Sequence, residues 1–388
     1  MSETPVQRQS IHIMLDARTL HRPHRRGIGK TLASLYERVL AVNPGWRVTG
    51  CHRGPHPQGL DSPGYRPRAL GCPGDRFDAW RRWRLPLAAW RDRADLLHLP
   101  ANLATPWMPA PAIVTVHDLL PMRFDDGTAR RLDASIRRCV CRRLTILTPS
   151  RFTADQIIQT YRADPVRVVV APWAADPAMT PTPDPATREA VARRYGVPGP
   201  FVLHLGAPDP RKNTARVIEA FAALPPKLRN TWSLLIVGLA DPGHRERLAE
   251  QCHQLGAGAS VKLHGFADEA DMPALFSAAE ALLYPSRGEG FGLPILDAFA
   301  TDTAVLTSPN TSLTEVGGDA VVYADADDAD AITDRLRWLL EDDAARRRLA
   351  GRGRQRGSTF TWAATADRFV AAVETTLGIA TEAARDAA

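Results

Sequence analysis

The chain contains few cysteines and no long run of apolar residues. Its five cysteines are scattered over 388 residues. So few cysteines at irregular spacing exclude a disulfide framework and a zinc site, and we expect free thiols. No stretch approaches the ~20 apolar residues that span a membrane. The first ten residues, MSETPVQRQS, lack the apolar core of a secretory signal. These absences predict a cytoplasmic protein.

Charge is unevenly distributed along the chain. The formal net charge is +6, but residues 1–180 are basic and the remainder is mildly acidic. A basic half is typical of proteins that bind nucleic acid, an anionic membrane surface or an acidic ligand. No nucleic-acid-binding motif accompanies it, so we expect no nucleic-acid partner.

Two series of short apolar runs, each alternating with helical stretches, predict two α/β domains with open sheets. Five prolines within residues 171–185 predict a linker between them, because proline disfavours both helix and central strand. Ligands of such sheets bind at the carboxyl ends of the strands. The expected strands are residues 11–15, 96–99, 112–116, 144–148 and 166–170, then 201–205, 234–237, 261–263, 281–284, 304–307 and 320–323.

Residues 281–300 carry the most functional information; they are ALLYPSRGEGFGLPILDAFA. The pattern predicts a buried strand, a glycine-rich turn around Glu289, and a helix with Pro294 in its first turn. Free N–H groups at a helix start bind phosphate. A carboxylate repels phosphate, so we expect Glu289 to bind a neutral, hydroxyl-rich group joined to the phosphate, such as a sugar. The alternative is a surface turn with a solvated acid.

Two adjacent cations, Arg211 and Lys212, follow the strand expected at residues 201–205. An arginine can bind two phosphate oxygens, and a lysine acts as a point charge, so the pair suits a diphosphate. The alternative is a solvated helix start, where cations are unfavourable.

The first half contributes two weaker motifs. Gly27-Ile28-Gly29 follows the first expected strand and precedes a helical pattern at residues 31–40. Glycine permits the close approach that a phosphate needs. His117-Asp118 follows the strand expected at residues 112–116. A lone histidine at a strand end is usually structural.

The donor-site signature of the retaining glycosyltransferases of family 4 resembles residues 286–300, SRGEGFGLPILDAFA. Further blocks of that family, in its order, are similar to the HD pair, DPRKN, HGF and FTW of this chain, so the resemblance covers about residues 11–369. It implies the GT-B fold, in which two Rossmann-like α/β domains face a cleft.

The resemblance also implies a role for each part of the chain. Residues 1–172 are expected to form the acceptor-side domain, and residues 173–185 the linker. The nucleotide-sugar donor domain is expected at residues 186–357. Residues 358–388 are expected to hold a helix that crosses back to the first domain, followed by a tail.

The resemblance assigns residues to the donor. Glu289 would orient the sugar hydroxyls, and Arg211 and Lys212 would stabilise the diphosphate leaving group. His117 would approach the primary hydroxyl of the sugar. Other donor contacts would come from Gly27 and Gly29, from the backbone near Phe266, from the N–H groups of Gly290, Phe291, Gly292 and Leu293, and from Asp297 at the ribose.

Two positions depart from the family pattern. Asp297 stands where the family has a glutamate, one methylene longer, and Ala207 stands where many members have an arginine. A non-catalytic nucleotide-sugar-binding protein is therefore one alternative. An epimerase or phosphorylase of the same fold is another, although no additional acid–base group supports it.

The implied reaction moves a hexose from a nucleoside diphosphate to an acceptor hydroxyl with retention. The GIGKT and HD segments resemble bacterial polysaccharide mannosyltransferases, so GDP-mannose is the favoured donor, and UDP- and dTDP-sugars remain alternatives. The implied acceptor is a glycan or a polyprenyl-diphosphate-linked oligosaccharide. We expect no cofactor and no metal.

Residues 76–93 combine Trp80, Trp83 and Trp90 with six arginines. Tryptophan and arginine together suit a membrane interface with anionic head groups. A second basic cluster consists of Arg137, Arg138, Arg142 and Arg143. An anionic membrane surface is therefore an expected partner. The alternative is a helix pair with its tryptophans packed inside and its arginines outside.

Overall fold

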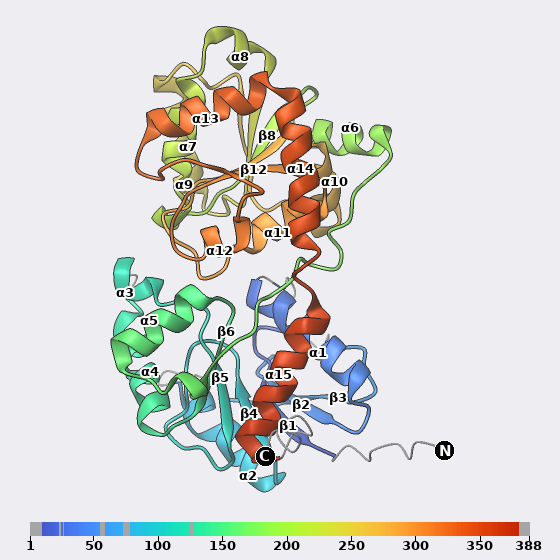
Figure 1. Cartoon of the computed structure of the whole chain (residues 1–388), viewed down its shortest axis with the longest axis vertical. Coiled ribbons are helices and arrows are strands. Elements are labelled where there is room, and N and C mark those ends of the chain that lie inside the picture. The colour runs from blue at the N-terminus through green and yellow to red at the C-terminus, as the bar shows by residue number, and fades with distance from the viewer. Residues whose placement is uncertain are drawn as a thin grey trace. The chain divides into compact units, whose positions relative to one another are not determined.

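The computed structural model describes residues 10–22, 25, 27–54, 59–72, 78–124 and 127–379. They fall into two compact units. The first contains the described residues up to Trp173 and those from Thr361 onward, and the second is Ala174–Phe360. The chain therefore passes between the units twice (Figure 1). None of the described helices is long and apolar enough to cross a membrane.

In the described part of the first unit, seven parallel strands form one sheet in the order β3-β2-β1-β4-β5-β6-β7. The strands are β1 (His12–Asp16), β2 (Arg47–His52), β3 (Tyr65–Ala69), β4 (Leu96–Leu99), β5 (Ala112–Thr115), β6 (Thr145–Thr148) and β7 (Val168–Val170). The helices are α1 (Gly27–Val42), the π-helix η1 (Trp80–Arg84), α2 (Leu85–Arg91), α3 (Leu120–Phe124), α4 (Ala129–Cys141), α5 (Arg151–Tyr161), the 3-10 turn η2 (Pro165–Arg167) and α15 (Trp362–Leu377).

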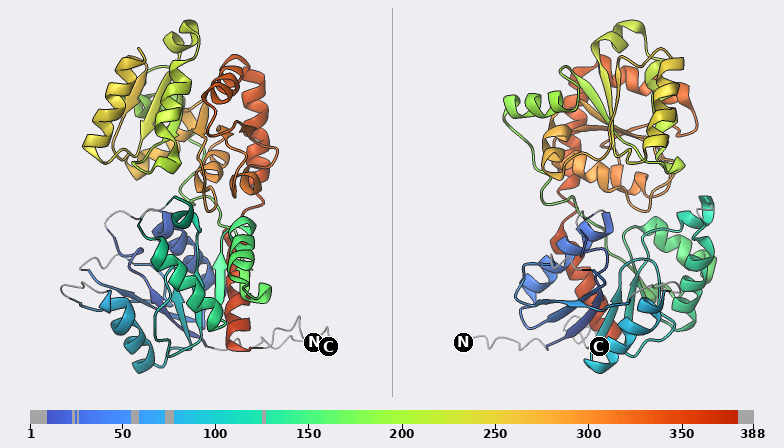
Figure 2. Two further views of the ribbon diagram at one scale, coloured as in Figure 1. Left: turned by 90° about the vertical axis from the view of Figure 1, so that its left-hand side faces the viewer. Right: turned by 180° about the vertical axis from the view of Figure 1, so that it is seen from behind.

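The helices of the first unit cover both faces of its sheet, as Figure 2 shows from two further sides. Side chains of η1, α2, α4 and α5 pack in one apolar cluster with Met14, Leu97 and Val114 of the strands. On β4, His98 alternates with Leu97 and contacts the ring of Phe369 on α15, with centroids 5.1 Å apart. The last helix is therefore part of the core of the first unit.

The two chain segments that pass between the units meet on the first unit. Trp173 is the last residue before the chain leaves the first unit. Its ring stacks on that of Trp362, at the start of α15, with centroids 6.1 Å apart. The hydroxyl of Thr365 donates to the carbonyl of Pro172. Residues 171–184 hold four of the five prolines and contain neither helix nor strand, and the fifth, Pro185, begins the next helix.

In the second unit, six parallel strands form one sheet in the order β10-β9-β8-β11-β12-β13. The strands are β8 (Phe201–Leu205), β9 (Ser233–Val237), β10 (Val261–Leu263), β11 (Ala281–Tyr284), β12 (Ala304–Thr307) and β13 (Val322–Tyr323). The helices are α6 (Pro185–Arg194), α7 (Thr214–Ala222), α8 (Pro226–Thr231), α9 (Pro242–Gln254), α10 (Met272–Ala278), α11 (Leu293–Ala300), α12 (Leu313–Gly317), α13 (Ala329–Glu341) and α14 (Asp343–Gly357), with 3-10 turns η3 (Pro210–Lys212) and η4 (Glu269–Asp271).

Strand order reverses beside the first strand of this sheet. β8 pairs with β9 on one side and with β11 on the other. At such a switch point, the loops after the two neighbouring strands leave in opposite directions and open a crevice at the carboxyl edge. The loops after β8 and β11 are those that carry Arg211, Lys212 and Glu289.

Candidate active site

The loop after β8 is fixed to the loop after β11 by one asparagine. Asn213 follows η3 and has a left-handed backbone, with φ of 62°. Its Nδ2 donates to the carbonyl of Pro285 at 3.0 Å and to the carbonyl of Ala326 at 2.6 Å. This tether places η3, and with it Lys212, beside the glycine-rich turn.

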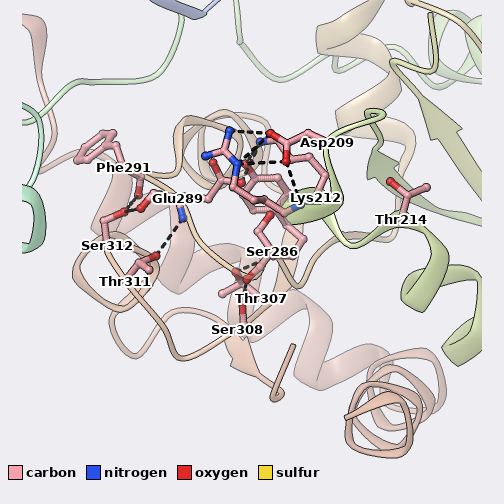
Figure 3. A network of polar contacts seen from close by, with 12 residues as sticks. Asp209, Lys212, Thr214, Ser286, Glu289, Phe291, Thr307, Ser308, Thr311 and Ser312 are labelled. Atoms are coloured by element: carbon pink, nitrogen blue, oxygen red, sulfur yellow. Dashed lines mark hydrogen bonds and ion pairs between the residues drawn. The ribbon is translucent and has the colours of Figure 1, made fainter. Parts of the chain in front are cut away.

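Lys212 and Glu289 form an ion pair at this edge. Nζ of Lys212 lies 2.8 Å from Oε1 of Glu289 and donates to the hydroxyl of Tyr284, also at 2.8 Å (Figure 3). The two charged side chains are 25% and 14% exposed. Burial lowers the pKa of Lys212, but Glu289 and Tyr284 outweigh it, so the pKa lies well above its ordinary value. Lys212 is therefore an ammonium at every physiological pH.

The turn that carries Glu289 is held by the residues that follow β12. The amide of Glu289 donates to Oγ1 of Thr311 at 3.0 Å. The buried hydroxyl of Ser312 lies 2.8 Å from the carbonyl of Glu289 and 2.9 Å from that of Phe291. Figure 3 shows these contacts around the turn. They fix the backbone, so the position of the carboxylate is set before any ligand binds.

The turn leads directly into the start of α11. Gly292 has φ of +116°, and a Cβ there would lie 3.2 Å from a methyl of Leu313, so this position requires glycine. Helix α11 begins at Leu293, whose N–H has no partner one helical turn earlier. Pro294 carries no N–H, and the amide of Ile295 donates to the carbonyl of Gly292 at 3.0 Å. Gly290 and Phe291 are buried beside this start.

Asp297 lies in the second turn of α11. The helix begins at Leu293, so Asp297 is its fifth residue. Oδ1 of Asp297 accepts a hydrogen bond from the amide of Asp176 at 3.1 Å. The carboxylate thus already holds the segment that enters the second unit.

Arg211 is bound by the carboxylate of Asp209, a contact that the sequence did not predict. Its Nε and Nη2 donate to Oδ2 of Asp209 at 2.9 and 2.6 Å. Burial raises the pKa of Asp209, but the hydrogen bonds and the charge of Arg211 together lower it by more. The pKa of Asp209 therefore lies below its ordinary value. Arg287, directly before the glycine-rich turn, donates to Oδ1 of Asp327 at 2.7 Å. Lys212 is thus the cation that contacts Glu289.

Phe266 lies in the loop after β10 and has an exposed side chain. The carbonyls of His264 and Gly265 accept hydrogen bonds from Leu239 and Gly238 of the loop after β9, at 3.0 and 2.7 Å. The two loops are thereby joined at the same carboxyl edge as Lys212.

His117 follows β5 in the first unit and is a fixed, neutral imidazole. Its Nε2 lies 2.8 Å from the carbonyl of Pro100, which can only accept, so Nε2 carries the proton and Nδ1 carries the lone pair. Burial lowers the pKa of His117, although the bond to Pro100 opposes this. The backbone amide donates to Oδ1 of Asn102 at 2.7 Å, and the ring lies against Trp173, with centroids 6.1 Å apart.

Gly27 and Gly29 lie inside the first turn of α1. The expected start of this helix at residue 31 is wrong, since it begins at Gly27. A Cβ on Gly29 would lie 2.4 Å from the carbonyl oxygen of Thr19, so glycine is required there by the chain's own backbone. A Cβ on the exposed Gly27 would meet nothing within 4 Å.

The candidate residues thus form one set in each unit. Arg211, Lys212, Phe266, Glu289, residues 290–293 and Asp297 belong to the second unit, and Gly27, Gly29 and His117 belong to the first. Among the residues that the structure describes, no group of three or more His, Cys, Asp or Glu side chains gathers to hold a metal ion.

Comparison with known proteins identifies the family. The profile "Glycosyltransferase Family 4" matches residues 25–179, and "Glycosyl transferases group 1" matches residues 192–356. O-antigen chain mannosyltransferase B of Escherichia coli is 30% identical over 74% of this chain and 76% of its own. D-inositol 3-phosphate glycosyltransferase of Xylanimonas cellulosilytica is 27% identical over 84% and 80%.

The fold is shared with solved glycosyltransferase structures. Sucrose-phosphate synthase of Thermosynechococcus elongatus superposes with a TM-score of 0.77 at 20% identity, covering 96% of this chain and all of that one. Two α/β units with parallel sheets confirm the predicted GT-B fold. The chain belongs to the family 4, or group 1, glycosyltransferases.

Proposed function

We propose that the protein transfers a hexose, with retention, from a nucleoside diphosphate to a glycan or a polyprenyl-diphosphate-linked acceptor in bacterial surface polysaccharide synthesis. GDP-mannose is the favoured donor, because the E. coli relative with 30% identity is an O-antigen mannosyltransferase. UDP- and dTDP-sugars are the alternatives within the family. A relative with 27% identity is named for D-inositol 3-phosphate, so the acceptor needs its own experiment. The proposed location is cytoplasmic, beside the inner membrane.

The ion pair of Lys212 and Glu289 carries this proposal. An ammonium has three N–H donors, and in the described part of the chain two of them contact Tyr284 and Glu289. The third is left for a phosphate oxygen. Glu289 offers its remaining oxygen to hydroxyl groups. A ligand that joins an anionic diphosphate to a hydroxyl-rich ring can therefore contact both side chains at once.

Breaking the bond between sugar and diphosphate builds negative charge on the leaving group. The proposed catalysis is electrostatic, because that charge would be stabilised by cations and by backbone N–H groups. The cations are Lys212 and Arg211, and the N–H groups are those of Gly290, Phe291, Gly292 and Leu293. Glu289 would orient the sugar hydroxyls beside the developing positive charge on the ring. No metal and no cofactor takes part in this proposal.

The family resemblance assigns donor contacts to residues of the first unit as well. Nδ1 of His117 is an acceptor, so it suits the primary hydroxyl of the sugar. Glycine at residue 29 is explained by the carbonyl of Thr19, which a Cβ would meet, so the exposed Gly27 is the more suitable phosphate contact. In the second unit, Asp297 would bind the ribose and the backbone at Phe266 the base.

The proposed route to retention needs no protein nucleophile. The acceptor hydroxyl would attack from the face that the diphosphate leaves, and its proton would pass to a leaving phosphate oxygen. This is the route that the family resemblance implies. It gives Glu289 the role of orienting the sugar rather than bonding to it.

Release of nucleoside diphosphate from a panel of GDP-, UDP-, dTDP- and ADP-sugars tests the proposal, alongside thermal shift with each. We expect GDP-mannose to raise the melting temperature and to be turned over, with or without EDTA. Binding without turnover in the presence of acceptors would favour the non-catalytic alternative. Loss of turnover in EDTA would contradict metal independence, and no binding of any nucleotide sugar would overturn the proposal.

A further inference from the structure

The three tryptophans of residues 76–93 have different surroundings. Trp80 is fully buried, and its indole N–H donates to the carbonyl of Leu70 at 2.8 Å. Trp83 and Trp90 are 62% and 63% exposed. The alternative in which the tryptophans pack inside therefore holds for Trp80 and is wrong for the other two.

Trp83, Leu87 and Trp90 form one exposed apolar stripe, the Trp83 face. Their spacing of four and then three residues places them on one side of the helical segment formed by η1 and α2. Leu87 is 47% exposed. The opposite side of α2, with Leu85 and Ala88, packs into the core of the first unit. The burial of one side of α2 and the exposure of the other therefore place the Trp83 face on the side away from the core. Helix α2 is labelled in Figure 1.

Arginines without acidic partners flank this face. Arg82, Arg84, Arg91 and Arg93 are exposed, and within the described residues none has a carboxylate at ion-pair distance. Residues 79–91 contain no Asp or Glu. The exposed arginines of α14 differ, since Arg347 pairs with Asp343 and Arg354 with Asp302. In the part of the chain that the structure describes, the charge of these four arginines is therefore not compensated by a carboxylate at ion-pair distance.

We propose that the Trp83 face binds an anionic lipid surface. The indole rings would enter the head-group region, and the guanidinium groups would contact lipid phosphates. A lipid surface of this kind has an apolar interior beneath negatively charged head groups. The interior suits the indole rings and Leu87, and the head groups suit the arginines. A second copy of the chain is a poorer occupant, because its arginines would repel those of the first across a symmetric contact.

Co-sedimentation of the full chain with vesicles tests this inference. We expect binding to phosphatidylcholine vesicles with about 30% phosphatidylglycerol, no binding to pure phosphatidylcholine, and at least a tenfold loss of affinity between about 50 and 500 mM NaCl. W83S/W90S and R84Q/R91Q should each weaken binding at least tenfold. W338S, at a 42% exposed tryptophan of α13, and R347Q/R354Q on α14 are matched controls and should bind normally.

Three outcomes would overturn the inference. They are absence of binding to anionic vesicles at low salt, equal binding by W83S/W90S, and a wild-type dimer in solution that this variant abolishes. Melting temperature and turnover of nucleotide sugar should be unchanged in the surface variants. Because the inference rests on the Trp83 face and not on the donor site, vesicle binding and sugar transfer can fail separately.

Discussion

The amide of Asp176 donates a hydrogen bond to Oδ1 of Asp297 at 3.1 Å. Asp176 lies just after the point where the chain enters the second unit. Nearby, the amide of Thr182 donates to Oγ of Ser277 on α10 at 3.0 Å. The entering segment is therefore bound to two helices of the second unit, and the proposed ribose ligand is one of its anchors.

Asp297→Asn should weaken the binding of nucleoside diphosphate about tenfold. The amide keeps the size of the side chain but has a single acceptor oxygen, so it cannot accept from the Asp176 amide and from a ribose hydroxyl equally well. Titration calorimetry with GDP measures this. Asp334→Asn on α13 is the control and should bind as the wild type does; equal affinity of both variants would contradict a ribose role for Asp297.

Lys212→Ala and Glu289→Gln should each lower kcat/KM for the donor by about 100-fold, or about 2.7 kcal/mol of transition-state stabilisation. The alanine removes the charge that faces the diphosphate, and the glutamine keeps the shape but breaks the pair. Because the two side chains are in contact, the double variant should lose much less than the product of the two single losses. Lys227→Ala, at an exposed lysine of the same unit, should be unaffected, and strictly multiplicative losses would show that the pair does not act together.

Gly29→Ala should destabilise the protein by about 2 kcal/mol, while Gly27→Ala should be neutral or slightly stabilising. The added methyl at residue 29 would meet the carbonyl of Thr19, and at residue 27 it would meet nothing within 4 Å. Urea denaturation compares the two variants. Equal stabilities would show that the contact with Thr19 does not explain the glycine.

Stability should fall as the pH drops from about 6.5 to about 4. Burial lowers the pKa of His98 to about 3 and that of His204 to about 4. Below pH 6.5 the unfolded chain therefore binds protons that the folded chain does not, which costs roughly 1 kcal/mol per pH unit for each histidine. The contribution is complete above pH 6.5 and is lost as the pH falls toward these low values.

Urea midpoints measured between pH 7.5 and 4.5 test this dependence. In His204→Gln, the stability of the second unit should depend less on pH than in the wild type. His253→Gln, at an exposed histidine, should leave the pH dependence unchanged. A stability that is constant over this range in the wild type would contradict the prediction.

Buried strands were the most predictable part of the fold. The expected bounds of residues 96–99, 201–205 and 281–284 agree with β4, β8 and β11, because strands covered on both faces are continuous apolar runs. Strands β2 and β3 were not predicted. β3 is an edge strand with sequence YRPRA and mostly exposed side chains, so no apolar run marks it.

Helix starts and the anchors of the site were less predictable. Pro294 marks the start of α11 correctly, because it is the second residue of that helix. Helix α1 has no acidic residue in its first turn and begins at Gly27, four residues before the predicted helical pattern. Lys212 and Glu289 follow strands that turn out to be neighbours, so their proximity could be anticipated. The hold of Asp209 on Arg211, and of Ser312 on the glycine-rich turn, depends on loop geometry that spacing does not encode.

The stacked rings of Trp173 and Trp362 have a consequence for how the gene can be rearranged. The chain leaves the first unit and returns to it at the same place, so residues 174–360 are an insertion into the first unit, here called the N-terminal half. Replacing them with a short turn should yield that half alone with its final helix attached. By the same geometry, the excised insert from another family member could be grafted between the two indoles to exchange donor preference in one step.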